Sequence, residues 1–253
     1  MSDPHGETPH VWDGPTRWFH WINLVLVFLL ALSGYFVKYR SVFQVSGSEA
    51  KMAIIAAHAW VGYAFAINLA VRLIWAFVGN RNARWRAILP DRQALRGMGA
   101  ELRALWTRRP VAHLVRSPVS RLSATLMFIV MLGMAGTGLA RAGTDLYPLP
   151  LGPAVAAFVA KAGNQPSAIT WRNELELGDE ERLRLVGRVK TLTGVPHLYG
   201  SWILMGLIAL HIAGVTLTEV RQRSGLISTM VSGTTPPAAQ APPHTEPDPT
   251  RIA

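Results

Sequence analysis

Residues 194–219 are the most constraining feature of the sequence, because this apolar run, GVPHLYGSWILMGLIALHIAGVTLTE, carries two histidines. A bilayer core is crossed by about 20 apolar residues of helix, so the run is long enough to span a membrane. An ionisable side chain inside such a segment is costly and by default marks a functional site. His197 and His211 are 14 residues apart. At about 100° and 1.5 Å per residue they share nearly one helix face and lie about 21 Å apart. This spacing predicts two metal-ligating positions at opposite depths of the membrane.

Three more apolar runs of spanning length precede this one, and two of them contain a histidine. They cover about residues 16–37, 52–78 and 119–141. His20 lies roughly one turn inside the first run, and His58 lies one to two turns inside the second. The third run has no histidine, but its glycines Gly133, Gly136 and Gly138 would let another helix or a flat ring approach closely.

Positive charge is concentrated between the second and third runs. Residues 79–121 hold ten arginines against Asp91 and Glu101, which gives +8 of the chain's formal +10. Because short loops rich in Lys and Arg stay cytoplasmic, this loop and both termini are predicted to lie inside. Residues 142–193 have six basic and six acidic side chains, as expected for the periplasmic side. The arginines lie beside membrane runs, so we interpret them as a topology signal and expect no nucleic acid partner.

Local signals predict several helix ends. Thr16 is the predicted N-cap of the first span. Residues 179–193 are predicted to form a separate short helix, with acidic residues in its first turn and Gly194 as its stop.

Apolar residues within the basic loop recur at helical spacing and predict an amphipathic helix. They are Leu95, Met98, Leu102, Leu105 and Trp106, opposite Arg92, Arg96 and Arg103. Such a helix either lies on an anionic membrane leaflet or packs as a soluble helix, and the sequence leaves both interpretations open.

The predicted fold is all-α: a four-helix transmembrane bundle with a cytoplasmic basic loop and a longer periplasmic loop between spans three and four. The predicted membrane domain covers residues 16–231, with spans at about 16–37, 52–78, 119–141 and 195–219. Residues 1–15 are a polar tail, and the Pro-rich residues 232–253 are predicted to be disordered. The predicted location is a bacterial inner (plasma) membrane, in contact with lipid.

This topology sorts the four histidines by depth into an inner pair, His20 with His211, and an outer pair, His58 with His197. Each pair could hold one metal from opposite sides, and a haem iron with two imidazole ligands satisfies this geometry. The chain has no cysteine, which excludes thiolate-held clusters and covalently attached c-type haem. A zinc site would need its ligands in one coordination sphere, which the spacing in the fourth span forbids. A proton relay through the histidines does not explain the pairing.

Residues near the histidines are further candidates for the binding site. Gly62, Gly200 and Gly214 each follow a histidine by one turn and would leave room for a flat ring. Arg17 lies one turn before His20, and Arg72 lies near the inner face of the membrane, so either could meet haem propionates. Anchoring at the membrane surface explains both arginines equally well.

Four segments of this sequence resemble the bacterial cytochrome b561 superfamily, especially the b-type cytochrome subunits of nickel–iron hydrogenases. They are TRWFHWIN from Thr16, AHAWVGYAFA around His58, RLIWAFVGN at the end of the second span, and ALHIAGVTLTEVR around His211. The resemblance covers nearly all of residues 10–233. It implies a four-helix membrane protein with two haem b groups and quinone as mobile electron acceptor. The family's ligand positions match His20, His58, His197 and His211. Relatives tend to carry His-Asn-Pro before the third span, where this chain has Arg116, Ser117 and Pro118.

The resemblance implies electron transfer between a periplasmic partner, either a hydrogenase small subunit or a cytochrome c, and the quinone pool. Iron held by two histidines has no open position, so such haems carry electrons rather than bind oxygen. One alternative is a superoxide oxidase that reduces quinone, with Lys38, Arg40 and Lys51 as the basic patch that attracts the anion. Another is a haem-free membrane anchor subunit. The sequence leaves the oligomeric state open, a homodimer included.

Overall fold

The structure, a computed structural model, describes residues 12–107, 117–222 and 225–234. The predicted N-terminal tail therefore lies largely outside the described residues, as do most of residues 232–253 and Arg116.

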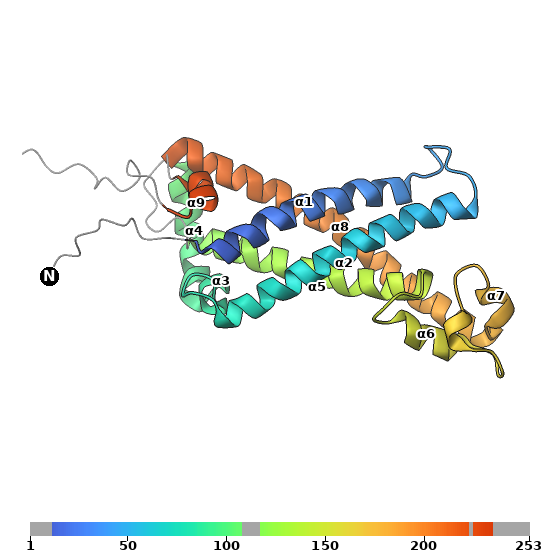
Figure 1. The fold of residues 1–253 in the computed structure, drawn as a ribbon. Helices are drawn as coiled ribbons and strands as arrows, with labels where there is room; N and C mark the ends of the chain where they lie inside the picture. Colours follow the sequence, from blue (N-terminus) through green and yellow to red (C-terminus); the bar gives the residue numbers. More distant parts are fainter. Residues whose placement is uncertain (1–11, 108–116, 223–224, 235–253) are drawn as a thin grey trace, which may run out of the picture. The chain divides into compact units, whose positions relative to one another are not determined.

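Four long helices contain the four apolar runs (Figure 1). They are α1 (Gly14–Lys38), α2 (Ser48–Val78), α5 (Pro118–Asp145) and α8 (Glu180–Gln222). Each is long and apolar enough to cross a membrane. The prediction of an all-α protein with four candidate spans is thus confirmed.

Shorter helices lie between the long ones, and one more, α9, follows the last of them. They are α3 (Trp85–Ile88), α4 (Arg92–Trp106), α6 (Gly152–Val159), the 3-10 helix η2 (Pro166–Ala168), α7 (Glu174–Leu177) and α9 (Leu226–Ser232). The helix predicted within the basic loop is therefore present as α4.

The chain divides into two compact units, and each long helix contributes to both. Unit 1 contains residues 1–18, 75–124 and 210–253, and unit 2 contains residues 19–74 and 125–209. In unit 2, segments of all four long helices pack around one apolar core. Its buried members are Val27, Phe65, Leu69, Met131 and Leu204.

Large apolar side chains on the same helices remain exposed. Phe28 on α1, Trp60 on α2 and Leu210 on α8 are each more than 60% exposed. A water-soluble protein rarely leaves so many large apolar side chains of its long helices uncovered, whereas a membrane-spanning helix presents them to lipid.

Residues 146–179 of unit 2 form a folded cap beside the first turns of α8, and Figure 1 shows α6 and α7 there. Ala156, Val159, Ile169 and Val186 form its buried core. Arg172 binds both carboxylate oxygens of Glu49 at the start of α2, with N–O distances of 2.9 and 2.7 Å. Tyr147 donates a hydrogen bond to Glu174, and burial together with this carboxylate raises the pKa of the Tyr147 phenol. The predicted long segment between the third and fourth spans is therefore an ordered structure.

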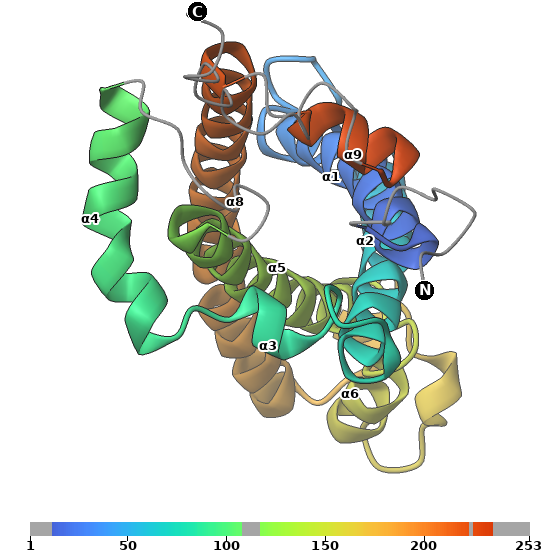
Figure 2. The same ribbon diagram turned by 90° about the vertical axis from the view of Figure 1, so that its left-hand side faces the viewer.

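Polar side chains connect the helices of unit 1. The Asp91 carboxylate caps α4 by accepting from the Ala94 backbone N–H at 2.7 Å, and it pairs with Arg121 of α5 at 3.2 Å. Glu101 is buried and accepts from the backbone N–H of Val119 in the first turn of α5. Figure 2 shows α3 and α4 as consecutive helices in this unit.

The N-cap predicted for the first span is wrong. The helix begins at Gly14, and the Asp13 carboxylate accepts from the backbone N–H of Thr16 at 3.1 Å. An N-cap side chain reaches the third N–H of the helix, so the capping residue lies three positions before Thr16.

The predicted helix stop at Gly194 is also wrong, because α8 runs without interruption through this residue and Pro196. Gly194 instead allows close packing: a Cβ there would lie 2.7 Å from a guanidinium nitrogen of Arg141. Inside a bilayer the helix satisfies its own backbone polar groups, which favours continuation through glycine and proline.

Candidate functional site

The structure brings His58 of α2 and His197 of α8 together within unit 2. Their ring centroids lie 6.2 Å apart, and their planes are nearly perpendicular, at 88°. Both side chains are half-buried. Two imidazoles from different helices thus lie close together inside one unit.

A hydroxyl group contacts each of these imidazoles. The Ser33 Oγ of α1 lies 2.9 Å from the Nδ1 of His58, and the Thr137 Oγ1 of α5 lies 2.9 Å from the Nδ1 of His197. All four long helices therefore contribute to the site: α2 and α8 supply the imidazoles, and α1 and α5 supply the hydroxyls.

A glycine follows each hydroxyl residue and lies against the same imidazole. A Cβ on Gly34 would lie 3.4 Å from the Cε1 of His58, and a Cβ on Gly138 would lie 3.3 Å from the Cε1 of His197. Glycine at these two positions lets each ring lie directly against a helix backbone.

This arrangement fits a haem better than a bare metal ion. Nitrogen-to-metal distances of about 2 Å on both sides would separate two opposed imidazole centroids by about 6 Å. The described residues contain no group of three or more His, Cys, Asp or Glu placed to hold a metal ion. A structural zinc ion needs four protein ligands, whereas a porphyrin supplies four of its own and asks the protein only for axial ones.

His20 and His211 belong to different units, His20 to unit 2 and His211 to unit 1. The His20 ring lies edge-on to Trp21, with centroids 5.3 Å apart. His211 is half-buried in α8. The pairing of these two histidines stays a prediction.

The two candidate arginines make contacts within their own units. Arg17 donates to the backbone carbonyl of Val231 in α9 at 2.6 Å. Arg72 is only 4% exposed, and its guanidinium lies 5.8 and 5.7 Å from the rings of Phe19 and Phe128. A cation over aromatic faces is stabilised by the ring quadrupoles, so Arg72 is accommodated inside the helix packing.

The candidate glycines have different surroundings. A Cβ on Gly200 would lie 2.9 Å from the sulfur of Met134, so this glycine brings α8 close to α5. Gly62 has more room, with Leu30 at 4.0 Å, and Gly214 has no atom of the described residues within 4 Å of its would-be Cβ. Their role beside a bound ring stays a prediction.

A polar network connects the last turns of α5 with the part of α8 that precedes His197. Arg141 donates to the backbone carbonyl of Lys190 and pairs with Asp145, both at 2.9 Å. Lys190 lies 3.5 Å from the same Asp145 carboxylate. These residues tie the end of α5 to α8 just outside the histidine pair.

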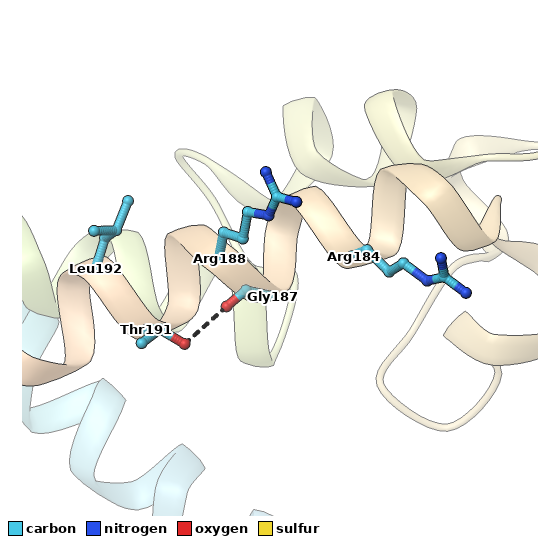
Figure 3. Close-up of a pocket in the computed structure, with 5 residues that line it drawn as sticks. All are labelled: Arg184, Gly187, Arg188, Thr191 and Leu192. Atoms are coloured by element: carbon cyan, nitrogen blue, oxygen red, sulfur yellow. Dashed lines mark hydrogen bonds between the residues drawn. The ribbon is translucent and has the colours of Figure 1, made fainter.

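Figure 3 shows a separate pocket on α8, lined by Arg184, Gly187, Arg188, Thr191 and Leu192. Thr191 donates to the carbonyl of Gly187, and Arg184 pairs with Glu180. The lining comes from a single helix and includes no histidine, so this pocket is distinct from the histidine pair.

Sequence reasoning missed Ser33, Gly34 and Thr137. It identified Gly138 only as one of three glycines that would admit a ring. Each hydroxyl residue precedes a glycine, as Ser33-Gly34 in the first span and Thr137-Gly138 in the third, but the same dipeptide occurs as Thr193-Gly194 and therefore does not single out the site.

Comparisons with known proteins identify the family of the chain. The profile of the family described as prokaryotic cytochrome b561 matches residues 11–233. A probable Ni/Fe-hydrogenase B-type cytochrome subunit of Rhizobium leguminosarum bv. viciae is 27% identical over 92% of this chain and 93% of its own length. A probable Ni/Fe-hydrogenase 1 B-type cytochrome subunit of Escherichia coli (strain K12) is 23% identical over 88% of this chain and 89% of its own. A probable Ni/Fe-hydrogenase B-type cytochrome subunit of Azotobacter vinelandii is 26% identical over 88% and 87%. No solved structure matches the chain.

Proposed function

The chain belongs to the prokaryotic cytochrome b561 family, and we propose that it is a di-haem b-type cytochrome that transfers electrons between a periplasmic redox partner and the membrane quinone pool. The observation that carries this proposal is the pair of imidazoles of His58 and His197, whose ring centroids lie 6.2 Å apart and which come from two apolar helices. Membership of a b-type cytochrome family supplies the chemical identity of the group they would hold.

The four histidines hold two haems in this proposal: His58 with His197 the outer one, and His20 with His211 the inner one. When bound, each haem iron carries one electron at a time by changing its oxidation state. In each proposed pair the two histidines would supply imidazole ligands to the iron and would leave no open position for another molecule. Arg17 and Arg72 are the proposed partners of the propionates. Gly62, Gly200 and Gly214 leave room for the rings.

The proposed orientation places the basic loop and both termini in the cytoplasm. Residues 79–121 carry the charge that supports it, because arginine-rich short loops are retained inside. The folded cap of residues 146–179 then faces the periplasm of a bacterium, next to the outer histidine pair. The haem held by His58 and His197 would accept electrons at the cap side, and the haem held by His20 and His211 would pass them to quinone within the membrane.

The proposed periplasmic partner is a nickel–iron hydrogenase, because all three relatives described above are named as cytochrome subunits of such enzymes. The cap offers an apolar surface for docking: Leu149 is 73% exposed and Leu175 is 84% exposed. A periplasmic cytochrome c would occupy the same surface if it replaced the hydrogenase.

Haem content of purified variants tests the proposal. We expect reduced-minus-oxidised spectra and haem assays to show two haems per chain. His58→Ala and His197→Ala should each lose one and the same haem, because either change removes an axial ligand from the outer site. His20→Ala and His211→Ala should each lose the other. A chain without haem would leave only the anchor function, and joint loss of one haem by His20→Ala and His58→Ala would contradict the pairing.

An electron-transfer assay then tests the partner. The chain reconstituted with the hydrogenase in vesicles should reduce quinone in the presence of hydrogen, and the His197→Ala chain should not. Quinone reduction by superoxide with the isolated chain would instead support a superoxide oxidase.

A further inference from the structure

We propose that Ser33 and Thr137 are positioning residues for the outer haem: their hydroxyls accept hydrogen bonds from the Nδ1–H groups of His58 and His197, leave both Nε2 atoms for iron, and lower the reduction potential. This inference rests on the proposed function, since it concerns the same histidine pair. It adds one residue on α1 and one on α5, the two long helices that carry neither histidine of this pair.

The single proton of the Ser33 hydroxyl determines the tautomer of His58. Ser33 Oγ lies 2.7 Å from the carbonyl oxygen of Leu29, one turn earlier in α1, and 2.9 Å from the Nδ1 of His58. A carbonyl oxygen has no proton to give, so the Ser33 proton must lie on the Leu29 side of this short contact. The remaining lone pair of Oγ therefore accepts from His58, whose proton is on Nδ1.

The same argument from a single hydroxyl proton applies to Thr137 on α5. Its Oγ1 lies 2.7 Å from the carbonyl oxygen of Gly133 and 2.9 Å from the Nδ1 of His197. The hydroxyl donates to its own helix and accepts from the imidazole. Both histidines thus carry their proton on Nδ1, and the Nε2 lone pair of each is available to a metal.

The neighbouring glycines fix the ring orientation as well as the tautomer. Gly34 lies 3.4 Å and Gly138 3.3 Å, measured from their would-be Cβ atoms, from the Cε1 of the ring that the preceding hydroxyl binds. Each ring is therefore bounded by a backbone surface and a hydrogen bond on the same helix. This combination of a hydroxyl and a glycine occurs twice, on α1 beside His58 and on α5 beside His197.

An acceptor on the distal N–H of a ligating histidine makes the imidazole a stronger electron donor. A stronger donor stabilises the more positive, oxidised iron and lowers the reduction potential. Removing either hydroxyl should therefore raise the potential of the outer haem while the iron ligands stay in place. The equilibrium between oxidised and reduced haem should shift on the order of tenfold, which is about 59 mV for a one-electron couple.

Redox titration of the full chain in detergent or nanodiscs tests this. The test variants are Ser33→Ala and Thr137→Val, which remove the hydroxyls, and the rescue variants are Ser33→Thr and Thr137→Ser, which keep them. Thr144→Val and Ser201→Ala are matched controls. Thr144 donates to Ala140 and Ser201 to Leu198, so each bonds its own helix, and neither bonds an imidazole in the described part of the chain.

We expect the two test variants to raise the potential of one haem, the same in both, and the rescue and control variants to keep the wild-type value. Wild-type potentials in both test variants, with two haems bound, would overturn this inference and leave the proposed function intact. If Ser33→Ala loses the outer haem, its restoration by Ser33→Thr supports the inference, and failure of both variants overturns it. A wild-type chain without haem would overturn the proposed function itself.

Discussion

Single glycines decide whether the imidazoles of unit 2 can occupy their positions. Gly138 and Gly136 are on the same helix and two residues apart, but only Gly138 lies against an imidazole. A Cβ at Gly138 would meet the Cε1 of His197 at 3.3 Å, whereas one at Gly136 would meet no atom of the described residues within 4 Å. Close approach of a ring to the backbone is thus a requirement at one position and not at its neighbour.

We therefore expect Gly138→Val to lose the outer haem and Gly136→Val to keep both haems. The branched side chain at position 138 would displace His197 by more than a methyl group does, because the space is already filled at the Cβ. The haem-to-protein ratio of purified variants measures this, and equal haem content in the two variants would contradict the assignment of Gly138 to the site.

The histidines could be predicted from the sequence, but the hydroxyls beside them could not. A histidine is rare inside an apolar span, so each one stands out. Serine and threonine in helices commonly bond the carbonyl four residues earlier, and this makes them unremarkable. Several other threonines of this chain do so, among them Thr144, Thr191, Thr193 and Thr218. Only the three-dimensional neighbour distinguishes Ser33 and Thr137 from these.

At the scale of elements, hydropathy predicted the four long helices but placed the start of α8 wrongly. The acidic residues 179–181 do begin a helix, as expected. Gly194 was interpreted as its end because glycine is a common helix terminator. The structure shows a different use of glycine, close contact with Arg141, which depends on a partner outside the local sequence.

The amphipathic helix α4 shows how polar contacts and an apolar face are separated within one element. On one face of α4, Glu101 accepts a hydrogen bond from the Val119 N–H and so connects α4 to the start of α5. Leu95 and Leu102 are about half exposed, and Trp106 is 82% exposed. Among the two interpretations left open by the sequence, this exposed apolar face favours a helix that lies on the membrane surface.

The N-cap of α4 predicts a pH dependence. The Ala94 backbone N–H, followed by Arg121, lowers the pKa of Asp91 below its ordinary value of 3.8. A lowered pKa means that the cap stabilises α4 above this ordinary value, and that its contribution is lost as the pH falls through the folded-state pKa. The protection of the Ala94 amide against hydrogen exchange, taken as its rate relative to the intrinsic rate at the same pH, should therefore fall at low pH.

Asp91→Asn is the matched variant for this measurement. Asparagine keeps an oxygen that accepts from Ala94 but does not titrate, so the protection of this amide should no longer fall at low pH. A loss of protection of the same size in Asp91→Asn and wild type would show that another group is responsible.

At the scale of the whole molecule, the chain is a membrane protein in which each long helix contributes to both compact units. Its charge is distributed unequally between the connections: residues 79–121 are strongly basic, and residues 142–193 are balanced. The proposed orientation follows from this difference in charge alone. The structure adds exposed positions at which the orientation can be tested.

The orientation can be tested by labelling single introduced cysteines, because the sequence has no cysteine that would react in the background. In the proposed orientation a single cysteine in the cap, Leu175→Cys, should react with a membrane-impermeant thiol reagent in cells whose outer membrane has been removed. Gln93→Cys in α4 should react only in inverted vesicles. Both positions are exposed, so access to the reagent depends on the side of the membrane. Labelling of Gln93→Cys in the intact cells would reverse the proposed orientation.

The unbroken course of α8 has a consequence for how this chain can vary. One continuous rod of 43 residues carries both His197 and His211, so the number of residues between them fixes their relative height and direction. Adding or deleting a single residue in that interval would swing one imidazole by about 100° around the rod. The interval should therefore tolerate exchange of its lipid-facing side chains far better than any change in its length.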